Sequence, residues 1–124
     1  MNKYEERFRF ELECERRTGL VTWYGFEAIT LKLAADVRYT PDFLVIRPFP
    51  EGSRVEVYEV KGHMRDDARV KLRVAAALYP WIHFYLVTNM GGARQIRWNI
   101  LKVPAGELQP DAVARDAVLA PPLP

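Results

Sequence analysis

Cysteine is nearly absent from this chain of 124 residues, in which Cys14 is the single example. One cysteine cannot close an internal disulfide, so the chain is not a disulfide-stapled scaffold. Cys14 lies with Phe10 in a helical pattern, and we expect it to be a buried free thiol in a reducing compartment. The stretch from Asn2 to Arg9 is charged and leads into no apolar run, so we expect no signal peptide and a soluble, cytoplasmic protein.

Long apolar runs and the common nucleotide-binding motifs are also missing. No segment is long and apolar enough to span a bilayer. The sequence has no Walker loop, glycine-rich dinucleotide loop, nucleophile elbow or zinc-finger spacing, and no signature of a base-reading helix. What remains is a chain with 49% hydrophobic and 27% charged residues, a composition typical of one globular domain and too short for two. The net charge of +2 identifies no partner by itself.

Apolar periodicity predicts two helices and six strands. The helices are expected at 2–17 and from 66 or 67 to about 78, and the strands at 20–24, 26–33, 37–46, 54–61, 82–88 and 95–103. The strand–helix–strand unit at 54–88 is a candidate parallel crossover. We therefore predict an α/β (α+β) fold with one mixed β-sheet flanked by helices. The predicted domain covers residues 1–103, and the proline- and alanine-rich residues 104–124 are expected to form a tail.

Each predicted helix has an apolar face that could cover the sheet. In the first helix, Tyr4, Phe8 and Leu12 recur every four residues and form one stripe. In the second helix, we expect the apolar face at positions 70, 74, 77 and 78. Within the strand expected at 37–46, Pro41 cannot donate to a central ladder, so an edge, a bulge or a strand start is expected there.

Charged residues stand at the ends of two apolar strands. Glu59 and Lys61 share one face of their strand because side chains alternate, while Val60 points away. Two valines precede them on the same face. Asp42 leads into the continuous apolar run Phe43–Ile46, which is typical of a strand covered on both faces. Pairing of these two strands would bring the two acids together.

Two carboxylates and a lysine in this arrangement favour phosphodiester hydrolysis. Carboxylates held close together repel each other unless a cation lies between them. Mg²⁺ prefers oxygen ligands and keeps several of its waters, so two acids and a substrate phosphate suffice to hold it. The ion lowers the pKa of a bound water, and Lys61 can orient or deprotonate that water. The backbone carbonyl of Val60 would complete the ligand set.

Each of these residues also has an ordinary explanation. Glu-x-Lys pairs are common on exposed strands, where they form weak surface ion pairs. Asp after Pro is common in turns. The combination is more informative, because charges at the ends of buried strands need a partner or a purpose.

The stretch Tyr39–Leu44 followed by Glu59–Gly62 resembles the PD-(D/E)xK nuclease superfamily, which has the restriction-endonuclease-like fold. Within the superfamily it is similar to the phage endonuclease I family of Holliday-junction resolvases. It is more similar still to small phage-encoded nuclease-like proteins that open with Asn-Lys-x-Glu and later have Asp-Asp-Ala-Arg-Val-Lys, as in Asn2–Glu5 and Asp66–Lys71 here. The resemblance covers about residues 2–88, and the tail after residue 103 has no counterpart in it.

The resemblance implies a Mg²⁺-dependent endodeoxyribonuclease, with Mn²⁺ able to substitute. The substrate would be branched DNA such as a Holliday junction, and a homodimer would be required to cut two strands symmetrically. A phage-encoded enzyme of this kind would act in the host cytoplasm. The alternatives are a non-specific or nicking DNase, and a non-catalytic DNA-binding subunit of a phage replication or packaging assembly.

The superfamily commonly adds an acid from its first helix, which by the motif is Glu5. Glu5 lies at the edge of the apolar stripe and could reach the sheet, but Glu11 and Glu15 also lie on or near that stripe, so helix geometry alone does not choose. With Glu5, the expected catalytic set is Glu5, Asp42, Glu59 and Lys61, and the expected metal ligands are Glu5, Asp42, Glu59 and Val60.

Basic residues near Lys61 could hold DNA phosphates. Arg69 and Arg73 are four apart and share a helix face, whereas Lys71 lies elsewhere on the helix. An ordinary solvated helix face and an incidental histidine are the alternative interpretations. The expected DNA-binding residues are Arg38, His63, Arg65, Arg69, Lys71 and Arg73.

Overall fold

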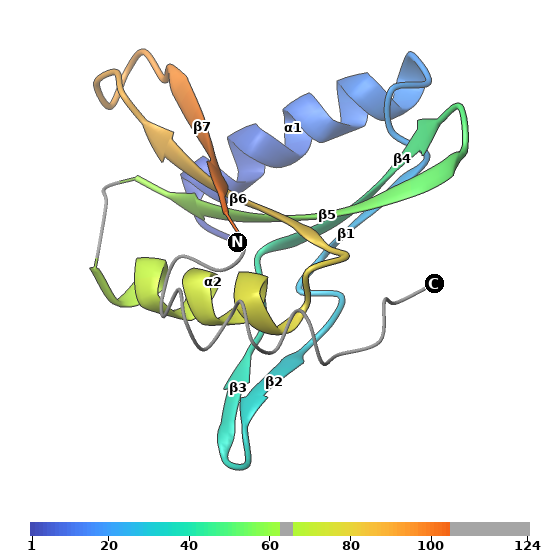
Figure 1. Ribbon diagram of the computed structural model, residues 1–124. Helices are drawn as coiled ribbons and strands as arrows, with labels where there is room; N and C mark the ends of the chain where they lie inside the picture. The colour runs from blue at the N-terminus through green and yellow to red at the C-terminus, as the bar shows by residue number, and fades with distance from the viewer. Residues whose placement is uncertain (63–65, 105–124) are drawn as a thin grey trace.

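The computed structural model of the chain describes residues 1–62 and 66–104. The predicted tail therefore lies almost entirely outside the described residues. No described helix has the length and apolar character needed to cross a membrane. The elements in chain order are α1 (Lys3–Arg17), β1 (Trp23–Phe26), β2 (Leu31–Ala34), β3 (Val37–Tyr39), β4 (Phe43–Phe49), β5 (Gly52–Lys61), α2 (Asp66–Leu78), β6 (His83–Asn89) and β7 (Trp98–Val103) (Figure 1).

Five strands form one mixed sheet in the order β1-β4-β5-β6-β7. β5 and β6 are parallel and are joined by α2, and the other neighbouring pairs are antiparallel. The predicted mixed sheet and its crossover at 54–88 are thus confirmed. β2 and β3 form a separate antiparallel hairpin that extends away from the sheet (Figure 1).

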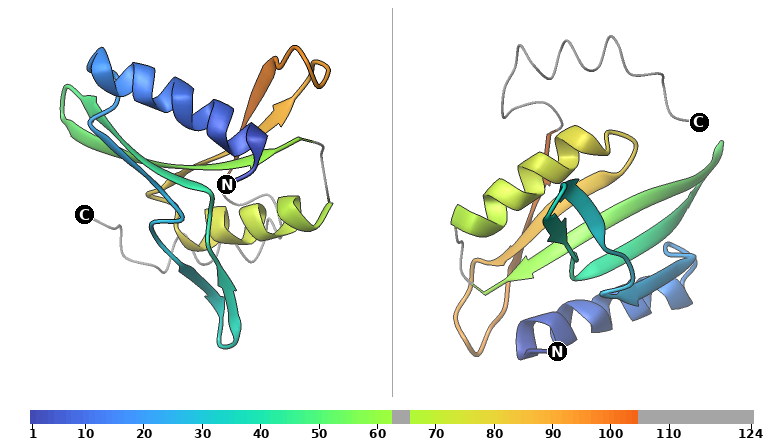
Figure 2. Two further views of the ribbon diagram at one scale, coloured as in Figure 1. Left: turned by 180° about the vertical axis from the view of Figure 1, so that it is seen from behind. Right: turned by 90° about the horizontal axis from the view of Figure 1, so that it is seen from below.

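Helix α1 covers one face of the sheet (Figures 1 and 2). Asn2 caps the helix in a reciprocal capping box with Glu5, and Gly19 follows its end with a φ of 86°, which suits a residue without a Cβ. The predicted stripe is confirmed, because Phe8 and Leu12 are buried and pack against the central strands. The acidic N-terminal turn of α1 is thereby fixed against the sheet.

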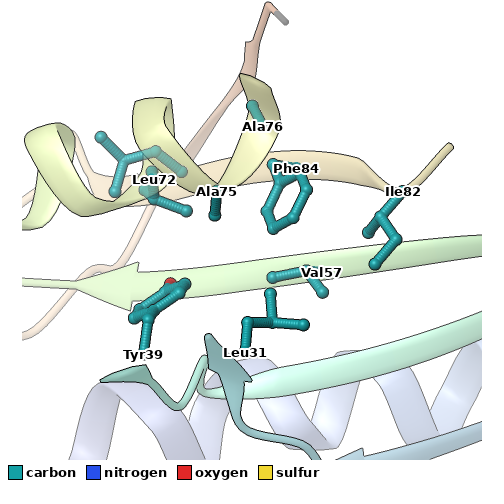
Figure 3. Close-up of a cluster of buried hydrophobic side chains, with 9 residues drawn as sticks. Leu31, Tyr39, Val57, Leu72, Ala75, Ala76, Ile82 and Phe84 are labelled. Carbon is teal, nitrogen blue, oxygen red and sulfur yellow. The ribbon is translucent and has the colours of Figure 1, made fainter. Parts of the chain in front are cut away.

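Helix α2 covers the opposite face, and the base of the β2–β3 hairpin packs beside it (Figure 2). Figure 3 shows Leu72 and Ala75 of α2 near Val57 of β5. Leu31 and Tyr39 of the hairpin belong to the same cluster and are drawn at the bottom of this view. The apolar face expected for this helix was wrong, since positions 70 and 78 are exposed. Nearly every position from 70 to 78 is apolar, so periodicity could not set the rotation of the helix, and close packing through small alanines decided it.

Three further expectations need correction. Cys14 is exposed, because α1 buries only the side that faces the sheet. The strand expected at 26–33 is interrupted, since β1 ends at Phe26 and β2 begins at Leu31. The strand expected at 37–46 is divided into β3 and β4 at Thr40–Pro41, where an irregularity was predicted.

Candidate functional site

Asp42 and Glu59 lie side by side at one end of the sheet. β4 begins at Phe43, which is paired with Tyr58 on β5, so the residue before β4 lies beside the residues after Tyr58. The backbone N–H of Asp42 points to Glu59 Oε1 at 3.4 Å. Both acids are nearly inaccessible to solvent, with 7% of Asp42 and 6% of Glu59 exposed. Pairing of the two strands thus brings the two acids together, as expected from the sequence.

The position of Asp42 is fixed by hydrogen bonds from both neighbouring strands. Its Oδ2 accepts the backbone N–H of Val60 at 2.8 Å, where the β4–β5 ladder has stopped. Its backbone carbonyl accepts the N–H of Glu27, just after β1, at 2.8 Å. A carboxylate held in this way has little freedom to turn away from Glu59.

Tyr39 and Lys61 hold the two oxygens of Glu59. The Tyr39 hydroxyl donates to Oε1 at 2.6 Å, and Lys61 Nζ lies 3.1 Å from Oε2. Tyr39 is buried, whereas the side chain of Lys61 is 33% exposed. Lys61 is therefore both anchored to the acids and open to an incoming molecule.

The surroundings of Asp42 disfavour its ionised form. Burial, followed by the charge of Glu59, raises the pKa of Asp42 to about 7, and Glu5 also raises it. The Val60 N–H and Lys61 act in the opposite direction but do not compensate. Burial and Glu59 also raise the pKa of Tyr39, so its hydroxyl stays protonated and remains a donor. Two acids thus lie side by side in a buried position, where added positive charge would favour their ionised forms.

Among the three acids considered on α1, Glu5 is the one whose charge reaches Asp42. Glu15 pairs instead with Arg47 at 3.1 Å, and Glu11 is bonded to Trp98. The start of α1 lies close to the end of β5, where a Cβ added to Gly62 would come within 2.5 Å of the Tyr4 ring. Gly62 is needed for this close approach.

The three carboxylates do not form a ready-made triple ligand. Across residues 1–62 and 66–104, no three His, Cys, Asp or Glu side chains are grouped closely enough to hold a metal ion. Glu5 Oε1 accepts the backbone N–H of Asn2 in the capping box. Asp42 and Glu59 alone fit Mg²⁺, which needs one or two carboxylates and fills its other positions with water and phosphate. The backbone N–H of Val60 donates to Asp42 Oδ2. The role of the Val60 carbonyl as a metal ligand stays a prediction.

The predicted DNA-binding residues lie in two places. Arg38 is exposed on β3, and Arg69 and Lys71 are exposed on α2, where Arg73 is half-buried. His63 and Arg65 lie outside the described residues. Helix α2 begins at Asp66, five residues after Lys61 in the chain (Figure 1).

Two residues of this region were not singled out as site residues from the sequence. Tyr39 is buried, and its hydroxyl donates to Glu59 across 20 positions of sequence. Thr88 is buried and is paired in register with Lys61 on the parallel strand β6. Its position two residues after buried Leu86, on the same face, was the available signal.

A cleft in the described part of the chain lies elsewhere, between α1 and β7. It has a volume of about 840 Å³, and its lining includes Phe10, Cys14, Arg47, Trp98 and Ile100. Neither Asp42 nor Glu59 lines it. This cleft is therefore separate from the acid pair.

The chain matches no known family model, no curated protein and no solved structure.

Proposed function

We propose that this chain is a Mg²⁺-dependent endodeoxyribonuclease of the PD-(D/E)xK type, with Asp42, Glu59 and Lys61 as its catalytic residues. The observation that carries the proposal is the buried pair of Asp42 and Glu59, which raises the pKa of Asp42 to about 7. Burying two acids side by side lowers stability unless the site has a use for their charge. Binding a divalent cation is the chemistry that relieves it.

Each residue has a distinct part in the proposed reaction. Asp42 and Glu59 hold the ion, and Glu5 is a candidate third ligand that would have to leave its cap. When bound, Mg²⁺ lowers the pKa of a water and offsets charge on the phosphate. Lys61, held by Glu59 and partly exposed, would orient the attacking water and stabilise the charge that develops on the phosphate oxygens. Tyr39 positions Glu59 and touches no reacting atom.

Two features favour an enzyme over a binding module. A DNA-binding module would gain nothing from buried negative charge, because DNA itself is negatively charged. The lysine is placed on the acid pair, where the reaction needs it, and not on an open basic surface. Branched DNA as the substrate and a homodimer as the active form belong to this proposal through the superfamily resemblance.

The test is cleavage of supercoiled plasmid, linear duplex and a four-way junction by purified protein, with Mg²⁺ or with EDTA. Wild type should cut at least one substrate with Mg²⁺ only, and Lys61→Ala should reduce the rate by about 10²–10⁴-fold. Lys102→Ala is a matched control, because Lys102 is exposed on β7 opposite Tyr85, away from the acids. Its rate should equal that of wild type.

The substrates also separate the alternatives. Preference for the junction supports a resolvase, and equal cutting of all substrates supports a non-specific DNase. DNA binding without cleavage under any condition would contradict the enzyme and support a binding subunit. Equal cleavage by wild type and Lys61→Ala would remove Lys61 from the mechanism.

A further inference from the structure

The β2–β3 hairpin has two different faces. Leu31 and Tyr39 are paired in register, and both are buried in the cluster under α2 (Figure 3). Lys32 and Arg38 are the next pair in register, and both are exposed. Because side chains alternate along a strand, the two cations lie on the outer face of the hairpin.

Among the residues that the structure describes, the two cations lie opposite each other without an acid paired to either. Like charges directly opposite on antiparallel strands destabilise the pair. In the described part of the chain, neither Lys32 nor Arg38 forms an ion pair, and Asp36 in the turn between the strands pairs with neither. An external anion would relieve this repulsion.

Two hydroxyl groups lie on the same outer face of the hairpin, and Thr40, which carries one of them, lies between Arg38 and Asp42 in the chain. Thr30 Oγ1 and Thr40 Oγ1 lie 2.7 Å apart, and both residues are exposed. Each hydroxyl has one proton, and their mutual bond uses only one of the two. The second proton can be donated to an outside acceptor such as a phosphate oxygen.

The hairpin is fixed relative to the acids. Tyr39, between Arg38 and Thr40 in the chain, donates to Glu59, and the Tyr79 hydroxyl donates to the Lys32 carbonyl at 2.8 Å. Arg38 is four residues from Asp42, which limits the distance between their backbones to about 13 Å. Measured along the axis of duplex DNA, where each strand has one phosphate per about 3.4 Å, that distance corresponds to roughly four phosphates of one strand.

We propose that the outer face of the β2–β3 hairpin binds the sugar–phosphate backbone of DNA beside the acid pair. Lys32 and Arg38 contact phosphates, and the Thr30–Thr40 pair donates to a phosphate nearer to the acids. This inference rests on the proposed function, since it takes the same DNA as its ligand. It adds Lys32 and the two threonines to the DNA contacts and makes these contacts independent of base sequence.

The test is fluorescence anisotropy of a labelled duplex over a series of salt concentrations in EDTA, so that no cleavage occurs. The double variant Lys32→Gln with Arg38→Gln should bind about tenfold more weakly at moderate salt. The slope of log K against log salt should become shallower by about 1.8, which corresponds to two lost phosphate contacts. Its melting temperature should equal or exceed that of wild type, because the repulsion is removed.

Two controls exclude simpler explanations. Arg16→Gln with Arg17→Gln removes the same charge from the exposed C-terminal end of α1 and should leave the slope unchanged. Exchanging the two cations, Lys32→Arg with Arg38→Lys, keeps the charge and should restore binding. Failure of the exchanged variant to bind better than the neutral one would overturn the proposed phosphate contact.

The outcomes also separate this inference from the proposed function. Equal affinity and slope for wild type and the neutral variant would overturn the hairpin contact, while Mg²⁺-dependent cleavage that needs Lys61 would still support the nuclease. Absence of any DNA binding and of any cleavage would overturn both.

Discussion

Strand β5 buries two glutamates three residues apart, and the two are treated in opposite ways. Glu56 lies on the α1 face, where Arg47 and Arg54 both pair with it and the Tyr58 hydroxyl donates to it at 2.7 Å. Glu59 lies on the α2 face beside Asp42, with Lys61 and Tyr39 as its partners. Only 3% of Glu56 and 6% of Glu59 is exposed, so burial does not distinguish them.

The surrounding charge does distinguish them. Two guanidinium groups neutralise Glu56, which is what a buried structural acid requires. At Glu59 the second acid adds negative charge, and the pKa of Asp42 is raised to about 7 as a result of burial and of Glu59. The first arrangement compensates the charge of the buried acid, whereas the second disfavours ionisation of Asp42 beside Glu59. Buried acids indicate function here only where their charge is left in excess.

Of the substitutions that separate the two buried acids, Asp42→Asn should have the largest effect on cleavage. The amide oxygen can still accept the Val60 N–H, so the fold is retained, but one negative ligand is lost. We expect DNA cleavage with Mg²⁺ to fall by about 10³-fold or more, because ion binding supplies several kcal/mol to the reaction. A rate within threefold of wild type would show that Asp42 does not take part.

In the middle of β5, Glu56→Gln should affect folding instead of cleavage. Removing this acid leaves Arg47 and Arg54 without their shared partner, so the free energy of unfolding should fall by about 3 kcal/mol. Urea denaturation followed by circular dichroism measures this loss. At temperatures where the variant is folded, its cleavage rate should match that of wild type, and a selective loss of cleavage would contradict the division of roles.

The raised pKa of Asp42 should make the free energy of unfolding depend on pH. With its pKa raised from 3.8 to about 7, folded Asp42 keeps a proton that the unfolded chain has lost. The free energy of unfolding of the metal-free protein should therefore fall as pH rises from about 4 to about 7, by up to about 4 kcal/mol, and then level off with respect to Asp42. Comparing wild type with Asp42→Asn over this range isolates the effect, and identical curves would refute it.

The smallest expected effect comes from Tyr39→Phe. The ring still fills the cluster under α2, but Glu59 loses the hydroxyl that fixes its Oε1. Cleavage should fall by roughly tenfold, as for other groups that orient a ligand. Raising the Mg²⁺ concentration should recover part of the rate, since a positioning defect weakens ion binding; no recovery would indicate a direct chemical role.

Some features of the fold and of the site could be predicted from the sequence, and others could not. Strand alternation and apolar runs are local signals, so the mixed sheet, its crossover and the approach of Asp42 to Glu59 could be predicted. The exposed face of α2 could not be predicted, because apolar residues occur on nearly all sides of this helix. The hydrogen bond from Tyr39 to Glu59 could not either, because it depends on where a separate hairpin packs.

The most direct measurement of the central claim is the change in melting temperature with Mg²⁺ at pH 8, where Asp42 is ionised. Addition of about ten times the dissociation constant should raise the melting temperature of wild type by roughly 4–6 °C. Glu56→Gln should melt at a lower temperature but show the same rise, whereas Asp42→Asn should show almost none. An equal rise in wild type and Asp42→Asn would contradict the claim that the excess charge at Asp42 and Glu59 is a cation site.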